Sequence, residues 1–431
     1  MDPATGLIAV GAAIFGGAAV WRLVRNFVPR TTRDSSGSKD GVDPPDPPVL
    51  RVVALGLDGA GKTVLLASQF HTLSTPDSER RFFLDVDWEQ ENYLAGLFKT
   101  VSDPLAPWPR ATRIGNLHEF VFGCTAHDLA DVERTLFQIS YLDYAGELLA
   151  AEPLDESHDP LDPVTEGQGP IQELKARVRA ADALLLILDG RRMLQLLRGE
   201  DAGKDYFEWR MAPLLAVARR AKCPVQLVLT KWDLVRTFDD CDEEQLLHKV
   251  RDELLSNRRV ELIVQAQRAR NQRVRLIPVS AVGPGFADLN AEGEVVKRRD
   301  GRVQPVHVDV PLCAVLPDVL RQLEREHAAS VRIEIERQMR RRKTASAAAI
   351  ARSVLTGPAG RALQAAASRF VGRWVVELFV GLLVAERKVS AGHQPRDADD
   401  EELQRLRAEV VNDMRGIAAR VERAYPSSIL R

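Results

Sequence analysis

Short apolar runs recur through the middle of the chain, and each ends at glycine or polar residues. The runs at 49–57, 135–143, 181–188, 223–229 and 273–279 are rich in leucine and β-branched residues. They are too short for typical helices, so they predict buried strands. Helical segments between the strands would cover both faces of a mostly parallel sheet. The pattern therefore predicts an α/β fold, with ligands bound at the carboxyl edge of the sheet.

Three further segments complete the predicted domain. Residues 117–125 form another apolar run, separated by "AHDLADVE" from the strand at 135–143, and we expect the two to pair as a hairpin. Residues 295–308 contain an Asp-Gly pair between alternating positions and predict a second hairpin. A helix at 316–328 would close the domain, which we place at 49–330. Its two long insertions lie at 71–111 and 150–175.

The first strand leads directly into "GLDGAGKT" and then into a helical pattern. A strand, GxxxxGK[ST] and a helix are the context of a phosphate-binding loop. Gly56, Gly59 and Gly61 allow the backbone to wrap so that its N–H groups face phosphate oxygens. Lys62 would reach the β- and γ-phosphates, and the Thr63 hydroxyl would bind Mg²⁺. The predicted phosphate-binding residues are Asp58, Gly59, Ala60, Gly61, Lys62, Thr63 and Val64.

Three later strand ends indicate which nucleotide is bound. Asp143 ends one strand in "DYAGE" and is a predicted Mg²⁺ residue. "TKWD" places Asp233 where a carboxylate would accept two hydrogen bonds from guanine; adenine offers neither donor, so it would leave that carboxylate unpaired. Thr230 and Lys231 precede it, the lysine stem packing on the base. "VSA" ends the last strand, where the N–H of Ala281, beside Ser280, would donate to guanine O6.

These motifs, in this order, resemble the Ras-like and translation-factor class of P-loop GTPases (the TRAFAC clade) across residues 49–330. The loop "GLDGAGKT" is similar to that of ADP-ribosylation-factor-like proteins, whereas "DYAGE" replaces their usual DVGGQ and Thr230 replaces the more frequent Asn. Together with the chain length and the apolar N-terminus, "DYAGE" also resembles bacterial GTPases of the double-GTPase type. The resemblance implies that GTP is hydrolysed to GDP and phosphate with Mg²⁺.

The predicted catalytic residues are Lys62, Gly146 and Glu147. The Gly146 N–H would sense the γ-phosphate. Glu147 stands where Ras-like members carry the glutamine that orients water. A carboxylate accepts a hydrogen bond from water but cannot donate one, and it adds negative charge, so we expect slow hydrolysis without a partner; alternatively, Glu147 faces solvent. Thr112 is the predicted switch threonine on Mg²⁺. Arg110 or Arg113 is a candidate for neutralising phosphate charge.

The N-terminus is uninterrupted and apolar from Leu7 to Trp21, and the stretch from Ala4 to Val24 has 21 residues with one charge, Arg22, followed by more arginines. That length and charge asymmetry predict a transmembrane anchor within 1–30 and a cytoplasmic GTPase domain. A buried Ala/Gly helix is the alternative. Residues 31–48 are rich in Ser, Gly and Pro and predict a flexible linker.

Residues 331–431 predict a basic helical region. Between 332 and 373 lie ten Lys or Arg and two Glu, for a net charge of +8. Anionic lipid is one expected partner; a solvated helix face is the other interpretation. Residues 369–388 predict an amphipathic helix that packs on the GTPase domain, on another subunit or on the membrane surface. A last helix has one apolar face: Leu403, Leu406, Val410, Met414, Ile417 and Val421.

Composition narrows the partners. The net charge of −2 gives no global signal for nucleic acid, and the four scattered cysteines favour a reducing compartment over a disulfide framework. We therefore expect a membrane-anchored, nucleotide-controlled switch with a protein partner, either an effector or a second GTPase. The alternative is a GTP-dependent scaffold or receptor subunit that does not hydrolyse GTP, similar to the β subunit of the signal-recognition-particle receptor.

Overall fold

A computed structural model describes residues 47–78, 80–109, 117–145, 170–342, 345–367, 373–390 and 398–430. All of them belong to one compact unit, Pro47–Arg431. The predicted anchor at 1–30 and the linker up to residue 46 lie outside the described residues, as does most of the insertion at 150–175. No helix in the described ranges combines the length and the apolar composition needed to cross a bilayer.

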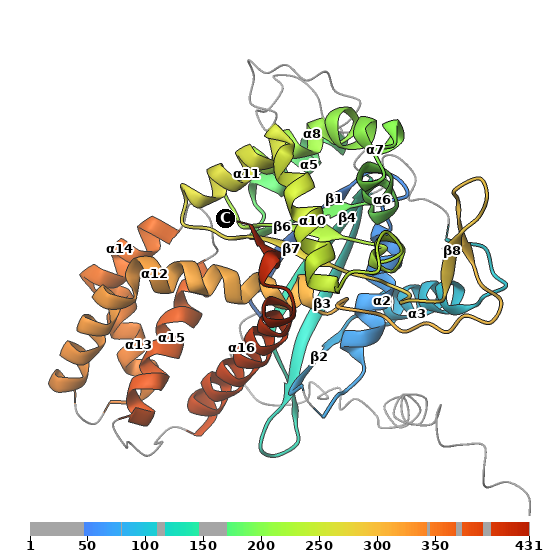
Figure 1. Ribbon diagram of the computed structural model, residues 1–431. Coiled ribbons are helices and arrows are strands. Elements are labelled where there is room, and N and C mark those ends of the chain that lie inside the picture. The colour runs from blue at the N-terminus through green and yellow to red at the C-terminus, as the bar shows by residue number, and fades with distance from the viewer. Residues whose placement is uncertain are drawn as a thin grey trace, which may run out of the picture. The chain divides into compact units, whose positions relative to one another are not determined.

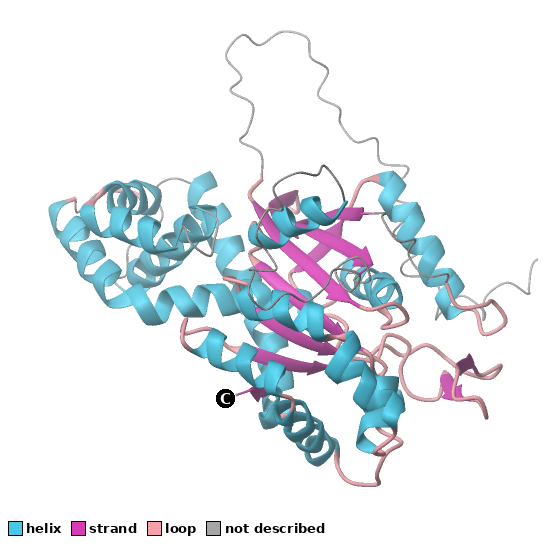
Figure 2. Ribbon diagram, turned by 90° about the horizontal axis from the view of Figure 1, so that it is seen from above, coloured by secondary structure: helices cyan, strands magenta, loops and turns pink. Residues whose placement is uncertain are grey.

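The described residues contain one large sheet with the strand order β10-β7-β6-β5-β1-β4-β3-β2 (Figures 1 and 2). From β7 to β4 the neighbours are parallel, while β10, β3 and β2 join antiparallel at the two edges. The strands are β1 (Val49–Gly56), β2 (Phe82–Asp85), β3 (Leu117–His127), β4 (Glu133–Ala145), β5 (Ala183–Leu188), β6 (Val225–Leu229), β7 (Val274–Pro278) and β10 (Ile429–Leu430). The predicted α/β class and mostly parallel sheet are confirmed.

Helices cover both faces of this sheet (Figure 2). Every residue of β5, β6 and β7 is buried, as expected for parallel strands packed on both sides. The first set of helices is α2 (Lys62–Ser74), α3 (Trp88–Ser102), α5 (Pro170–Arg179), α6 (Gly190–Leu197), α7 (Asp201–Asp205), the π-helix η1 (Tyr206–Arg210), α8 (Ala212–Arg220), α9 (Trp232–Val235), α10 (Glu243–Ser256) and α11 (Arg258–Arg268).

The C-terminal region is helical, as predicted, and is joined to the sheet. It comprises α12 (Val310–Arg341), α13 (Ala347–Thr356), α14 (Pro358–Ala367), α15 (Arg373–Ser390), α16 (Ala398–Ala424) and the short 3₁₀ helix η2 (Pro426–Ser428). The predicted apolar face of α16 is buried from Leu406 to Val421. In α15, Trp374 donates to Val49 O at 2.9 Å and stacks on Phe137, so this helix packs on the sheet domain.

Two details differ from the sequence interpretation. Residues 295–308 do not form a hairpin: β9 (Val295–Lys297) pairs with the preceding β8 (Ala287–Leu289) instead. Residues 303–306 turn back, and Val306 pairs with Ser280. The Asp-Gly pair therefore makes only a turn. In addition, α12 runs unbroken through residues 330 and 331, where the sequence indicates a boundary.

A buried ionic cluster fastens the tail to β7. Arg275, 2% exposed, donates to both carboxylate oxygens of Asp318 in α12, at 2.5 and 2.6 Å. Its third nitrogen lies 2.6 Å from Glu422 in α16. Burial disfavours each charge, but the opposite charges prevail: the pKa of Arg275 is raised and that of Glu422 is lowered.

We expect Arg275→Ala to destabilise the chain by about 3–5 kcal/mol, because it leaves the Asp318 carboxylate buried without its partner. Arg258→Ala is the matched control: Arg258 forms an exposed pair with Glu261, and such pairs contribute at most about 1 kcal/mol. Urea unfolding of both variants measures the difference. Equal midpoints would contradict the assigned role of the cluster.

Candidate functional site

The loop between β1 and α2 has the geometry of a phosphate-binding turn. Gly59 and Gly61 have φ angles of 71° and 84°, in the left-handed region that glycine adopts without strain. Gly56 has another role: a Cβ there would lie 2.9 Å from Ile187 in β5. Two glycines of the motif therefore shape the turn, and the first lets two strands approach each other.

Lys62 and Thr63 open helix α2 and are held in place. The Lys62 ammonium donates to the carbonyls of Gly56 and Leu57 at 2.8 and 3.0 Å. The Thr63 hydroxyl donates to Asp143 Oδ2 at 3.4 Å. The predicted metal residues Thr63 and Asp143 are thus brought together from α2 and the end of β4.

Asp143 is 3% exposed, and its Oδ1 is buried with no hydrogen-bond partner in the described part of the chain. Burial raises the pKa of this carboxyl, while Lys62, His118 and Thr63 act in the opposite direction. A hydroxyl and an orphaned carboxylate oxygen are hard oxygen donors of the kind that Mg²⁺ prefers. These residues therefore fit the predicted ion.

Strand β6 supports the loop from the side. The Thr230 hydroxyl lies 2.7 Å from Ala60 O and 2.9 Å from Leu188 O. Lys231, at a φ of 52°, donates to Gly59 O at 2.6 Å and lies 2.8 Å from Asp189 Oδ1. The replacement of the usual Asn by Thr230 therefore keeps a link to the P-loop.

Asp233 and Ser280 meet at the ends of β6 and β7. Ser280 Oγ donates to Asp233 Oδ1 at 2.5 Å and accepts from the N–H of Gly283 at 2.8 Å. Burial raises the pKa of Asp233, and the Ser280 hydrogen bond opposes this. Ser68 in α2 donates to Ala281 O at 2.7 Å, which fixes the third motif against the helix that follows the P-loop.

One cavity joins these groups. It is lined by nearly all of the predicted nucleotide-binding residues, namely Asp58, Gly59, Gly61, Lys62, Thr63, Val64, Thr230, Lys231, Asp233 and Ala281. Ala60 lies beneath the loop, fully buried, and Ser280 stands behind Asp233. Three motifs that are far apart in the sequence, the P-loop, "TKWD" and "VSA", therefore line one cavity.

The predicted switch residues cannot be placed. Gly146, Glu147 and Thr112 lie outside the described residues, as do Arg110 and Arg113. Their roles stay predictions. Asp189 caps α6 by accepting from the N–H of Arg191 at 2.9 Å, and it also pairs with Lys231.

Sequence reasoning missed part of the cavity wall. Trp108, Pro109, Val282, Ala287 and Val295 also line it. Trp108 and Pro109 lie at the end of the insertion at 71–111, and the other three follow the "VSA" motif. The only sequence signal was an apolar and aromatic content unusual for exposed loops.

No family model matches this chain, and no curated protein matches it. Solved structures do match it, at low sequence identity. One is the signal recognition particle receptor SRb-GTP/SRX complex from Chaetomium thermophilum, with 15% identity, a TM-score of 0.28, and 55% of this chain and 92% of that one covered. Another is the cytosolic domain of the T. maritima FeoB iron transporter in a GDP form, with 10% identity, a TM-score of 0.27, and 89% and 100% covered. At such low scores, the assignment of the site depends on its own geometry.

Gly190 is expected to tolerate no side chain. A Cβ there would lie 2.1 Å from Thr230 O, so Gly190→Ala must displace the end of β6, at a cost of about 1–3 kcal/mol. Gly96→Ala in α3 is the control, because no atom lies within 4 Å of that Cβ; it should be neutral or stabilising by up to about 1 kcal/mol. Thermal unfolding compares them, and a Gly190→Ala chain as stable as Gly96→Ala would refute the close approach.

Proposed function

We propose that this chain is a GTP-binding protein that hydrolyses GTP to GDP and phosphate with Mg²⁺, and that it acts as a switch for a protein partner. One observation carries the proposal: Lys62, Thr63 and Asp233 face the same cavity, with Asp143 behind Thr63. A cationic phosphate loop, an oxygen-donor pair for a divalent ion and a half-buried carboxylate for the base are the three recognition elements that GTP requires.

Each residue has a defined task in this proposal. The P-loop N–H groups and Lys62 bind the phosphates and offset their charge. Thr63 and Asp143 would hold Mg²⁺, which supplies charge neutralisation across the phosphates. Asp233, oriented by Ser280 at 2.5 Å, would accept from the guanine N1–H and 2-amino group. Adenine would offer this half-buried carboxylate no donor in place of the two of guanine, which is the basis of selectivity.

The proposal places the protein at a membrane through residues 1–30, with Leu7–Trp21 as the support. Consecutive exposed arginines at the end of α12, Arg340, Arg341 and Arg342, are compatible with nearby anionic lipid. Recovery of the full chain in the aqueous fraction after membrane separation would exclude this placement.

Nucleotide selectivity tests the base site. The full chain should bind a fluorescent GTP analogue far more tightly than the ATP analogue, and Lys62→Ala should abolish binding of both. Asp233→Asn should weaken GTP and shift preference toward xanthosine triphosphate, because the amide can donate to the extra oxygen of xanthine.

Matched titrations of the natural chain and of Asp233→Asn, each with GTP and with xanthosine triphosphate, measure this exchange of preference. An isosteric change keeps the volume of the site, so a stability loss should not obscure the result. Unchanged GTP affinity in Asp233→Asn would place the guanine pocket elsewhere, and equal binding of ATP and GTP by the natural chain would refute the proposed function.

A second candidate function is a GTP-dependent scaffold or receptor subunit that does not hydrolyse GTP. Glu147 in place of glutamine favours it, since a carboxylate beside phosphate disfavours attack by water. Single-turnover assays with radiolabelled GTP separate the two functions. We expect slow phosphate release that Glu147→Gln accelerates. A natural chain that retains intact GTP, both alone and with membrane extract, would support the scaffold.

A further inference from the structure

Two segments, one after helix α3 and one after the "VSA" motif, meet over one side of the candidate nucleotide cavity. Trp108 and Pro109 follow helix α3, whereas Ala287 and Val295 belong to the β8–β9 hairpin after the "VSA" motif. Both pairs line the cavity that Lys62 and Asp233 also line. The wall that faces the phosphate and guanine residues is therefore assembled from two segments far apart in the sequence.

Trp108 connects the two segments directly. Its indole N–H donates to Val295 O at 2.9 Å. Its ring meets the ring of Phe286 edge-on, with 6.2 Å between centroids. Because an indole has a single polar donor, its partner fixes the orientation of the whole ring. Trp108 is thus held against the hairpin by its N–H group, through Val295, and by its ring, through Phe286.

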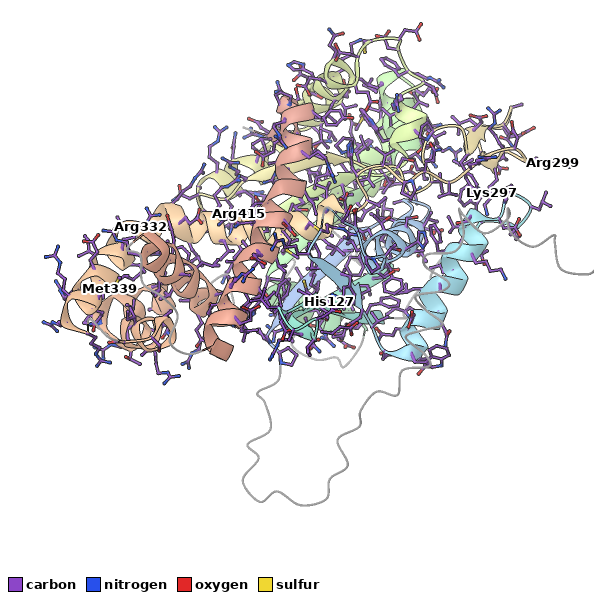
Figure 3. All side chains as sticks on the ribbon, turned by 90° about the horizontal axis from the view of Figure 1, so that it is seen from below. His127, Lys297, Arg299, Arg332, Met339 and Arg415 are labelled. Atoms are coloured by element: carbon purple, nitrogen blue, oxygen red, sulfur yellow. The ribbon has the colours of Figure 1, made fainter. Side chains whose placement is uncertain are left out.

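Lys297 closes the contact from outside the cavity. Its ammonium lies 4.7 Å from the centre of the Trp108 ring, a cation–π geometry. It also donates to the carbonyls of Thr100 and Asp103 at 2.7 and 2.9 Å, so it ties the hairpin to the end of α3. Figure 3 shows Lys297 on the hairpin beside this helix.

The apolar residues under this contact form a cluster separate from the main core. Val101, Val282, Phe286 and Ala287 are buried together, with Trp108 and Val295 packed against them. A small, separate cluster can open while the main core stays folded. Opening of this wall is therefore an event of lower cost than unfolding of the site.

We propose that Trp108, Val295 and Lys297 form a latch that sets how long the cavity retains its nucleotide, with Trp108 as the positioning residue. The inference rests on the proposed function and concerns its kinetics. The latch holds the wall by contacts between the segment after α3 and the β8–β9 hairpin. None of these contacts involves a phosphate-binding residue. It slows release of nucleotide, and a partner that separates the hairpin from Trp108 promotes exchange.

Release of N-methylanthraniloyl-GDP (mant-GDP) from the full chain, chased with excess GDP, tests the latch. Trp108→Ala should release the probe at least about tenfold faster, equivalent to about 1.4 kcal/mol. Trp108→Phe keeps most of the ring but loses the N–H donor, and should give a smaller acceleration. Lys297→Met is the decisive variant, because Lys297 does not line the cavity: faster release in it reports the latch and not a lost nucleotide contact.

Trp209→Phe is the matched control, since Trp209 is 68% exposed and lies on η1, away from the cavity. It should leave the release rate unchanged. Energy transfer from tryptophan to the probe should fall in Trp108→Phe and not in Trp209→Phe. Near-ultraviolet circular dichroism verifies that the variants fold.

The outcomes distinguish a failure of the proposed function from a failure of the latch alone. A natural chain that binds no mant-GDP overturns the proposed function and the latch with it. A natural chain that binds the probe, with release rates in Trp108→Phe and Lys297→Met within twofold of it, overturns the latch and leaves the GTP site intact.

Discussion

The site depends on one lateral connection, between the end of β6 and the P-loop. The Thr230 hydroxyl and the Lys231 ammonium reach the carbonyls of Ala60 and Gly59 at 2.7 and 2.6 Å. These bonds turn two loop carbonyls toward β6, which leaves the neighbouring N–H groups available on the other side of the peptides. The connection requires that the strand ends lie almost in contact, and this is why residues 56 and 190 have no side chain. The same contacts therefore position the candidate phosphate-binding loop and the candidate base-binding residues relative to each other.

The same strands connect the site to the C-terminal helices. β7 carries Arg275 three residues before its end and Ser280 just beyond it. Arg275 binds α12 and α16 through Asp318 and Glu422. Past the other end of α2, which begins at the P-loop, Arg81 meets Asp413 and Glu409 of α16. Helix α16 thus contacts segments that follow the phosphate motif and precede the last guanine motif. A partner bound to these helices would act on the strands that carry the candidate nucleotide-binding residues.

Much of this arrangement could be predicted from the sequence, and the rest depended on contacts that no local pattern encodes. The strands that end in motifs were predictable because fully buried parallel strands give continuous apolar runs. The burial of α16 followed from its helical periodicity. The pairing of β9 with β8 was not predictable, because the Asp-Gly pair at 300–301 is the stronger hairpin signal and Val306 pairs with Ser280 instead. β10 was missed because its two residues pair with a strand about 150 positions away, beyond the reach of local reasoning. Trp108 was missed because an isolated tryptophan in an insertion has no motif to mark it.

The distribution of fixed and exchangeable contacts suggests where control of the site resides. Lys62, Thr230 and Ser280 are each held by hydrogen bonds within the site, so these groups are preorganised. Preorganised groups favour affinity and selectivity, but they give a partner little to change. The contacts around Trp108 are of another kind, since they join the segment after α3 to the β8–β9 hairpin over a small apolar cluster that is separate from the main core. The residues at the strand ends would then determine which nucleotide binds, and the contacts around Trp108 would determine how long it stays bound. A regulator would change the lifetime of the bound state without disturbing the guanine contacts.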